Sequence, residues 1–195
     1  MISASTSAVP VVTIDGPGGA GKGTVASAIA ETKGWHLLDS GALYRIIAVA
    51  GLRQGIPLDD AVALAQLCPR LDIVFGAGSV KVSGDDFTDA IRTEDAGSSA
   101  SIVAALPPVR DAILTLQREF RKAPGLVADG RDMGTVVFPD APVKIFLDAS
   151  AEARAERRYN QLKNKGLGVN LRGLLEQIQE RDARDRERAV APLRP

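Results

Sequence analysis

A run of small residues and one lysine near the start of the chain has the composition of a loop that grips phosphate. The run reads Gly16, Pro17, Gly18, Gly19, Ala20, Gly21, Lys22, Gly23 and Thr24. Small residues let successive backbone N–H groups curl around phosphate oxygens, and the N-terminus of a following helix adds its positive dipole end. Lys22 would then reach the β- and γ-phosphates of a nucleotide. The run therefore predicts a nucleoside triphosphate site.

The residues on either side support that interpretation. Val11 to Asp15 form a β-branched run typical of a buried strand, and a helix is expected from about Lys22 to Lys33. Strand, Gly-rich loop and helix in this order strengthen the match. The strict pattern has Ser or Thr directly after the lysine, where this chain has Gly23 and then Thr24. A Gly-rich turn without a ligand is the alternative.

A second polar loop follows another expected strand. Leu126 to Asp129 read as a buried strand, and Gly130-Arg131-Asp132-Met133-Gly134 come next. Arg131 suits a bidentate phosphate contact, and Asp132 could accept from an exocyclic amine. Asp129 could order a Mg²⁺-bound water, with Thr24 as a second candidate, and we predict no direct metal ligand. Simple turn formation by Asp and Gly is the alternative.

A similar loop follows the expected strand at Leu37 to Asp39. Ser40, Tyr44 and Arg45 offer a hydroxyl, an aromatic ring and a guanidinium at the carboxyl edge of the sheet, where ligands of open α/β folds bind. These groups could meet a base and a phosphate. A helix cap by Ser40 and a packed Tyr44 explain the same residues without a ligand.

Arginines recur on the two helices expected late in the chain, at about 151–165 and 171–189. Arg181, Arg184, Asp185 and Arg188 share one helix face, and Arg154, Arg157 and Arg158 follow the last expected strand. Spacing alone favours a solvated face with weak ion pairs. An arginine-bearing flap that neutralises a transferred phosphoryl group and excludes water is the alternative.

The order of expected elements predicts an α/β fold. Strands at 11–15, 37–39, 126–129 and 143–147 alternate with helices, which favours a parallel sheet. Between about 56 and 105, a helix near 58–67 is followed by short β segments at 71–75 and 80–82 that glycines interrupt. This stretch predicts a small insertion with a hairpin.

Composition narrows the class of protein. The chain has 195 residues, 45% of them hydrophobic, and Lys+Arg and Asp+Glu each total 24. No basic field would draw it to nucleic acid or a membrane, and no run is long and apolar enough to span a bilayer. Cys68 is the single cysteine, so no internal disulfide is possible and a cytoplasmic location is expected. We expect residues 1–10 to be a disordered tail rather than an export signal.

Several of these motifs together, in this order, resemble the bacterial cytidylate kinases of the P-loop nucleoside monophosphate kinase superfamily. The likeness covers nearly the whole chain from Val12, and its most specific parts are Asp129 to Ala141 and the Arg-Asp run from Arg181. It implies a P-loop NTP hydrolase-like core of 11–55 and 106–195, an enlarged monophosphate-binding insertion of 56–105 and a lid of about 154–168.

The resemblance also implies an activity, namely Mg²⁺- and ATP-dependent phosphorylation of CMP and dCMP by direct in-line transfer, in pyrimidine nucleotide metabolism. ATP would lie on Gly16 to Thr24. The base would lie among Ser40, Arg110, Asp132 and Arg188, the sugar would bind Ser101, Arg181 and Asp185, and the acceptor phosphate would bind Arg45 and Arg131, near Tyr44 and Asp129. Lys22, Arg131, Arg158 and Arg184 would be catalytic. We expect a monomer.

Relatives in this family normally continue beyond the Ala-Pro-Leu-Xaa-Pro stretch with another strand and helix, whereas the sequence ends at Pro195. Arg188 lies close to that end, so its expected placement depends more than that of any other site residue on how the chain continues there. Alternatives remain at this stage: a kinase of another small acceptor such as UMP or shikimate, a nucleotide-sensing module without turnover, or an RNA contact by the terminal helix.

Overall fold

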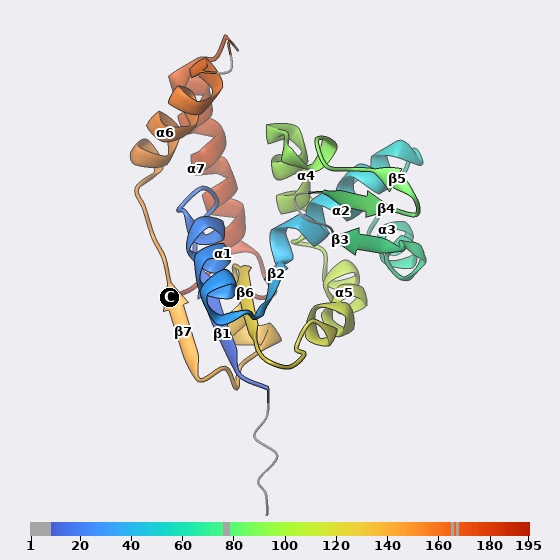
Figure 1. The fold of residues 1–195 in the computed structure, drawn as a ribbon. Helices are drawn as coiled ribbons and strands as arrows, with labels where there is room; N and C mark the ends of the chain where they lie inside the picture. Colours follow the sequence, from blue (N-terminus) through green and yellow to red (C-terminus); the bar gives the residue numbers. More distant parts are fainter. Residues whose placement is uncertain (1–8, 76–78, 165, 167) are drawn as a thin grey trace, which may run out of the picture.

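The computed structural model describes residues 9–75, 79–164, 166 and 168–195, and its centre is a parallel sheet (Figure 1). The sheet comprises β1 (Val11–Asp15), β2 (His36–Asp39), β6 (Leu126–Gly130) and β7 (Val143–Phe146). In the described residues the strand order is β2-β6-β1-β7 and every pairing is parallel. The predicted α/β architecture is confirmed.

Helices cover both faces of this sheet. On one face α1 (Lys22–Lys33) packs its Ala26 and Ala30 against Ile14 and Val127. On the other face lie α2 (Ser40–Arg53), α5 (Pro107–Glu119) and a π-helical turn at Met133–Val137. β1 and β6 are therefore buried on both sides, which is why they read as continuous apolar runs.

The predicted insertion contains its own small sheet. After α3 (Ala61–Leu67), strands β3 (Ile73–Phe75), β4 (Val80–Val82) and β5 (Asp85–Asp86) form an antiparallel meander. The predicted hairpin is confirmed, although α3 begins later than expected because the Asp60 side chain caps it by accepting from the Ala63 N–H group. α4 (Glu94–Val103), which the sequence did not predict, follows a cap by Thr93.

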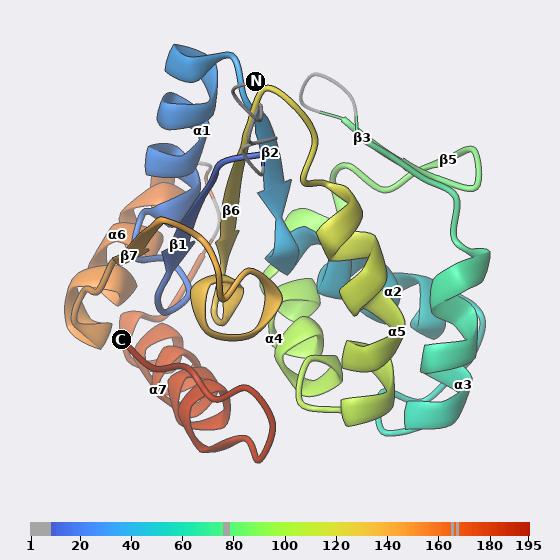
Figure 2. The same ribbon diagram turned by 90° about the horizontal axis from the view of Figure 1, so that it is seen from below.

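Helices of the insertion pack against helices of the core. α2 and α4 lie side by side, and α3 packs on α5 (Figure 2). Tyr44 and Ile47 of α2 share one apolar cluster with Val103 of α4 and Ile113 of α5. Because α2 begins directly at the end of β2, this packing holds the insertion at the carboxyl edge of the sheet.

Two antiparallel helices follow the last strand of the sheet. α6 (Ala151–Asn164) leaves the end of β7 and α7 (Leu171–Glu187) returns beside it (Figure 1). The Asn170 side chain caps α7 by accepting from the Arg172 N–H group. α7 also contacts α4, so it reaches from α6 to the insertion.

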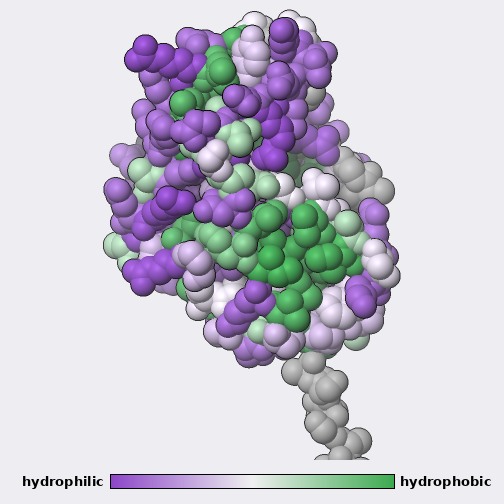
Figure 3. Space-filling model, turned by 90° about the vertical axis from the view of Figure 1, so that its left-hand side faces the viewer, coloured by the Kyte–Doolittle hydropathy of each residue, from purple (hydrophilic) through white to green (hydrophobic). Residues whose placement is uncertain are grey.

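The described part of the chain begins beside the sheet, and β7 is the edge strand on one side of it. Residues 1–8 of the predicted tail lie outside the described residues, whereas the Val9 and Pro10 carbonyls accept hydrogen bonds from Arg121 and Leu126. Figure 3 shows an apolar patch on the side where β7 is the edge strand, and there Val143 is 47% exposed.

Among the described helices, none alone is long and apolar enough to cross a membrane. The bent pair α4 and α5, with 103° between them, meets that test together by length and composition only.

Candidate active site

The carboxyl ends of β1, β2 and β6 open into a polar cleft of about 620 Å³. Its walls come from the loop before α1, from α2 of the core, from α4 of the insertion, and from α6 and α7. The predicted residues that line it are Gly18, Gly19, Gly21, Lys22, Gly23, Thr24, Arg45, Asp129, Arg131, Arg158 and Arg181. The cleft therefore collects the residues predicted to hold phosphates.

The Gly-rich loop needs glycine where the backbone turns most sharply. Gly16 has φ of 147°, and a Cβ atom there would lie 1.9 Å from the Leu147 carbonyl oxygen. Gly19 and Gly21 have φ values of 77° and 102°, which L side chains rarely adopt. Gly21 directly precedes α1, so the loop ends at a helix N-terminus, as an anion site requires.

Lys22 lies folded back into this loop. Its Nζ donates to the Pro17 carbonyl oxygen at 3.0 Å and lies 3.5 Å from Asp129 Oδ1, and the residue is buried. Burial, with the nearby Arg131 guanidinium, lowers the pKa of Lys22 to about 8. Burial likewise raises the pKa of Asp129 to about 6, although Lys22 opposes that shift. Both pKa values are thus shifted toward neutral pH, because burial disfavours the charged form of each group.

Arginines from three helices and one loop surround the cleft. Arg45 of α2 donates to the Ile91 carbonyl at 3.2 Å, and Arg158 of α6 pairs with Glu94 of α4 at 2.5 Å. Arg181 of α7 has its pKa lowered to about 10 by burial and by Arg131. Its guanidinium lies beside Gly18 and Gly97, where side chains would crowd it. This much buried positive charge calls for anionic ligands.

Deeper than these arginines lies a second polar group. Asp132 is buried between Arg110, with which it forms an ion pair, and Arg188, whose Nη2 lies 3.6 Å from its Oδ1. Arg110 also donates to the Tyr44 hydroxyl at 3.1 Å. Ser40 makes no side-chain hydrogen bond to Arg110, Asp132 or Arg188 among the described contacts. Its hydroxyl instead accepts from Gln117 at 2.9 Å.

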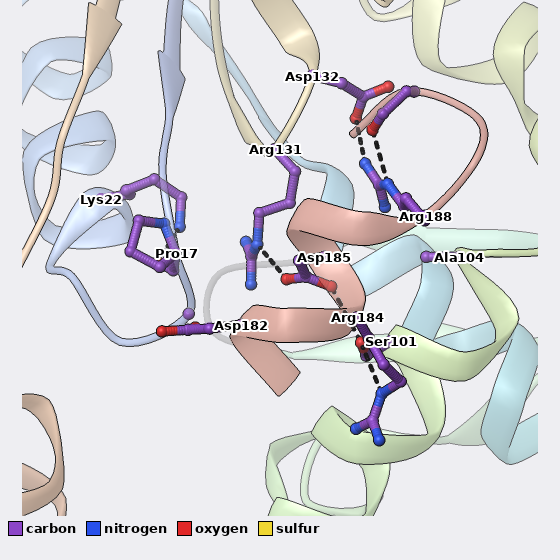
Figure 4. A network of polar contacts seen from close by, with 12 residues as sticks. Pro17, Lys22, Ser101, Ala104, Arg131, Asp132, Asp182, Arg184, Asp185 and Arg188 are labelled. Carbon is purple, nitrogen blue, oxygen red and sulfur yellow. Dashed lines mark hydrogen bonds and ion pairs between the residues drawn. The ribbon is translucent and has the colours of Figure 1, made fainter. Parts of the chain in front are cut away.

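Asp185 links the two polar groups. Its Oδ2 accepts from Arg131 Nε at 2.8 Å and its Oδ1 accepts from the Ser101 hydroxyl at 2.9 Å. Burial alone would raise the pKa of Asp185, but Arg131 and Arg181 hold it below its usual value. Figure 4 shows Lys22 and Pro17 on one side, Asp132 and Arg188 on the other, and Arg131 with Asp185 between them.

Most of the predicted base and sugar residues do not line the cleft itself. They are buried in polar groups beside it. Tyr44, Arg110, Asp132 and Arg188 form one group, Ser101 bonds to Asp185, and Ser40 bonds to Gln117. Arg184, predicted to be catalytic, does not line the cleft. Its guanidinium donates to the hydroxyls of Ser101 and Ser98 of α4, each 3.5 Å away.

Two residues that contact the site, Arg154 and Gln117, are not among the predicted site residues. Arg154 is buried, pairs with Asp182 of α7 and donates to the Gly18 carbonyl oxygen at 3.0 Å, so it ties α6 and α7 to the phosphate loop. Its spacing to Arg157 and Arg158 was the available signal. Gln117, the partner of Ser40, gave no signal, because a glutamine on a helix is usually solvated.

In the part of the chain that the structure describes, no group of three or more His, Cys, Asp or Glu side chains is placed to hold a metal ion. Thr24 and Asp129 both line the cleft, and Asp129 Oδ2 lies beside Gly23 of the phosphate loop. A cation that brings its own phosphate ligands would fit between them.

Known proteins of one family resemble this chain over nearly its whole length. The profile of the family described as "Cytidylate kinase" matches residues 12–195. The chain is 60% identical to the cytidylate kinase of Edwardsiella ictaluri over 194 residues, which is 97% of this chain and 86% of that protein. The cytidylate kinases of Aeromonas hydrophila and Pseudomonas paraeruginosa are also 60% identical, over 95% and 96% of this chain and 83% and 85% of theirs. The chain belongs to the cytidylate kinase family.

Proposed function

We propose that the chain transfers the γ-phosphoryl group of ATP to CMP or dCMP, which yields ADP with CDP or dCDP. The observation that carries the proposal is the position of Asp132, buried between Arg110 and Arg188 directly after Arg131 of the cleft. A group that reads a base thus adjoins groups that hold phosphates. The chain's family fits this activity.

The transfer itself needs positioning and charge rather than a covalent intermediate. An oxygen of the acceptor's phosphate attacks the γ-phosphorus, and the bond to the bridging oxygen of ADP breaks. Lys22 at the start of α1 and the N–H groups of the loop would hold the β- and γ-phosphates. Arg131 would neutralise charge on the group in transit.

We assign the acceptor's parts to the two polar groups. Arg45 and Arg131 of the cleft would bind the acceptor phosphate, and Ser101, Arg181 and Asp185 the sugar hydroxyls. Asp132 would accept from the cytosine N4 amine, while Arg110 and Arg188 donate to O2 and N3, with Ser40 nearby. Uracil carries an acceptor where cytosine has that amine, so a buried carboxylate there disfavours UMP.

The domain roles follow from the same assignment. The insertion of 56–105 would carry the acceptor side, and about 154–168, of which 165 and 167 lie outside the described residues, would act as the lid. Arg157 and Arg158 line the cleft from α6, and Arg154 already contacts the phosphate loop. A lid built on arginines both excludes water and adds positive charge near the γ-phosphate.

Mg²⁺ would enter with ATP, between the phosphates and the groups Thr24 and Asp129. When bound, it would supply positive charge that offsets the negative charge of the phosphates. Asp129 suits this role because its carboxylate lies beside the phosphate loop and, with a pKa of about 6, is mostly charged at neutral pH, so it would accept from a Mg²⁺-bound water. Donor and acceptor residues all come from one chain, which supports a monomer. The balanced charge supports a role on free nucleotides rather than nucleic acid or membranes, in the cytoplasm.

A panel of nucleoside monophosphates tests the function. With ATP and Mg²⁺, we expect CMP and dCMP to give the highest kcat/KM in a coupled assay of ADP release, and UMP to be slower by at least about tenfold. Faster turnover of AMP, GMP or dTMP would contradict the base assignment. ATP binding without transfer to any monophosphate would instead favour a nucleotide sensor.

The lowered pKa of Lys22 predicts how ATP affinity depends on pH. In the free protein Lys22 loses its proton as pH rises through about 8, and the phosphates of ATP bind its charged form. We expect the Kd for ATP, measured by calorimetry, to rise by up to about tenfold per pH unit above pH 8. The Lys22→Arg variant keeps its charge, so its affinity should stay flat up to pH 9.5. The same slope in both proteins would exclude Lys22 as the titrating group.

A further inference from the structure

Asp15, the last residue of β1, is a buried carboxylate that the assignment above does not use. Its Oδ1 accepts from the Met133 N–H group and its Oδ2 accepts from the Gly134 N–H group, each at 2.8 Å. Both oxygens are thus engaged by backbone groups of another segment. The phosphate loop begins at the next residue, Gly16.

The two N–H groups are the first donors of the π-helical turn at Met133–Val137. The first N–H groups of a helical turn have no partner within the turn, and an Asp in the preceding position usually accepts from them. Asp132 holds that position, but its own side chain makes no capping hydrogen bond. Asp15 supplies the cap from the neighbouring strand.

With Asp15 as the acceptor for the turn, the Asp132 side chain faces a different set of partners. Its oxygens are released from the turn and pair with Arg110 and Arg188. The negative charges of Asp15 and Asp132 also repel each other, and this repulsion acts on the pKa of Asp15, which burial raises. Repulsion adds to the preference of Asp132 for the arginines over the turn.

The placement is fixed by the sheet. Asp15 of β1 is the register partner of Gly130 of β6, and Arg131 and Asp132 follow directly. This register brings the side chain beside the loop, where each of its two oxygens accepts from a loop N–H group. A Cβ atom on Gly134 would lie 2.7 Å from the Thr13 hydroxyl, so the turn is packed closely against β1.

We propose that Asp15 is a positioning residue for base selection: it caps the Met133–Val137 turn in place of Asp132 and so leaves the Asp132 carboxylate free to read the base. The inference rests on the proposed function. It assigns to Asp15 no contact with either substrate. Its effect reaches the base through Asp132 alone.

The test is Asp15→Asn, whose amide offers one acceptor oxygen and turns an NH₂ group toward the second N–H donor. The Asp132 side chain is then drawn to the turn. We expect the CMP-to-UMP ratio of kcat/KM to fall by at least about tenfold and the KM for CMP to rise similarly, while the KM for ATP changes less than about threefold. Val11→Ala is the control, because Val11 is buried at the far end of the same strand.

A double-mutant cycle separates positioning from general stability. If Asp15 acts through Asp132, adding Asp15→Asn to Asp132→Ala should change the CMP-to-UMP ratio no further. Should Asp15→Asn not fold, Asp15→Glu, which moves both oxygens by one methylene, should produce the same shift. An unchanged ratio, or equal losses for CMP and ATP as in Val11→Ala, would overturn the proposal. A wild-type protein that does not prefer CMP would overturn the proposed function instead.

Discussion

Replacing Lys22 by alanine is expected to lower kcat for phosphoryl transfer by about 10² to 10³-fold, the usual cost of removing one charged group that stabilises the transition state. Lys22 is buried at the start of α1, and in the described structure its ammonium group contacts Pro17 and Asp129. With phosphates bound, that ammonium would exchange these contacts for phosphate oxygens. Without it, the charge on the group in transit loses one of the cationic side chains that would neutralise it.

Single-turnover kinetics with CMP and ATP measure this effect. The Kd for CMP should change little, because Lys22 and the Asp132 group belong to different ends of the site. Thermal unfolding controls for loss of structure, since removing the lysine leaves Asp129 with one partner fewer. A variant that keeps more than about a tenth of wild-type kcat would remove Lys22 from the catalytic assignment.

The second large effect is expected at Asp132. Asp132→Ala should lower kcat/KM for CMP by about 10² to 10³-fold, because the N4 amine loses its acceptor and Arg110 and Arg188 are left buried without their carboxylate. The KM for ATP should move much less, since Asp132 does not line the phosphate cleft. Equal losses for both substrates would rule out a role in reading the base.

Asp132→Asn gives the matched comparison. The asparagine amide keeps an acceptor oxygen for cytosine and adds an NH₂ donor for the O4 atom of uracil. We therefore expect UMP to gain and CMP to lose, so that their kcat/KM values approach each other to within about tenfold. Steady-state rates with both nucleotides test this, and a variant that still rejects UMP as the wild type does would disprove the hydrogen-bonding argument.

The core of the fold could be predicted from sequence because each buried strand carries its own signal. Val11 to Asp15 and Leu126 to Asp129 are short apolar runs that end in loop residues, and the structure pairs them in a parallel sheet. α4 could not be predicted in the same way, because Gly97, Ser98 and Ser99 are weak helix formers. Its Thr93 cap and its packing against α2 compensate for that composition.

The candidate site likewise has parts that the sequence predicts and parts that it does not. The phosphate loop was predicted from composition and context, because glycine and lysine at that spacing have few other uses. The face that carries Arg181 and Asp185 could not be assigned from spacing, because an amphipathic charged helix fits a solvated surface equally well. Only its contacts with Arg131 and Ser101 show that the face is buried. Asp15 gave no signal, because its partners are backbone N–H groups distant in sequence.

The course of α7 has a thermodynamic consequence. One turn of that helix carries Asp182, which faces Arg154 of α6, and Asp185, which faces Arg131 and Ser101. A displacement of α7 at one of these residues therefore moves the other. In the proposed assignment this couples the binding free energies of the two nucleotides, and linkage makes the coupling reciprocal. Whatever factor ATP applies to the dissociation constant of CMP, CMP must apply to that of ATP.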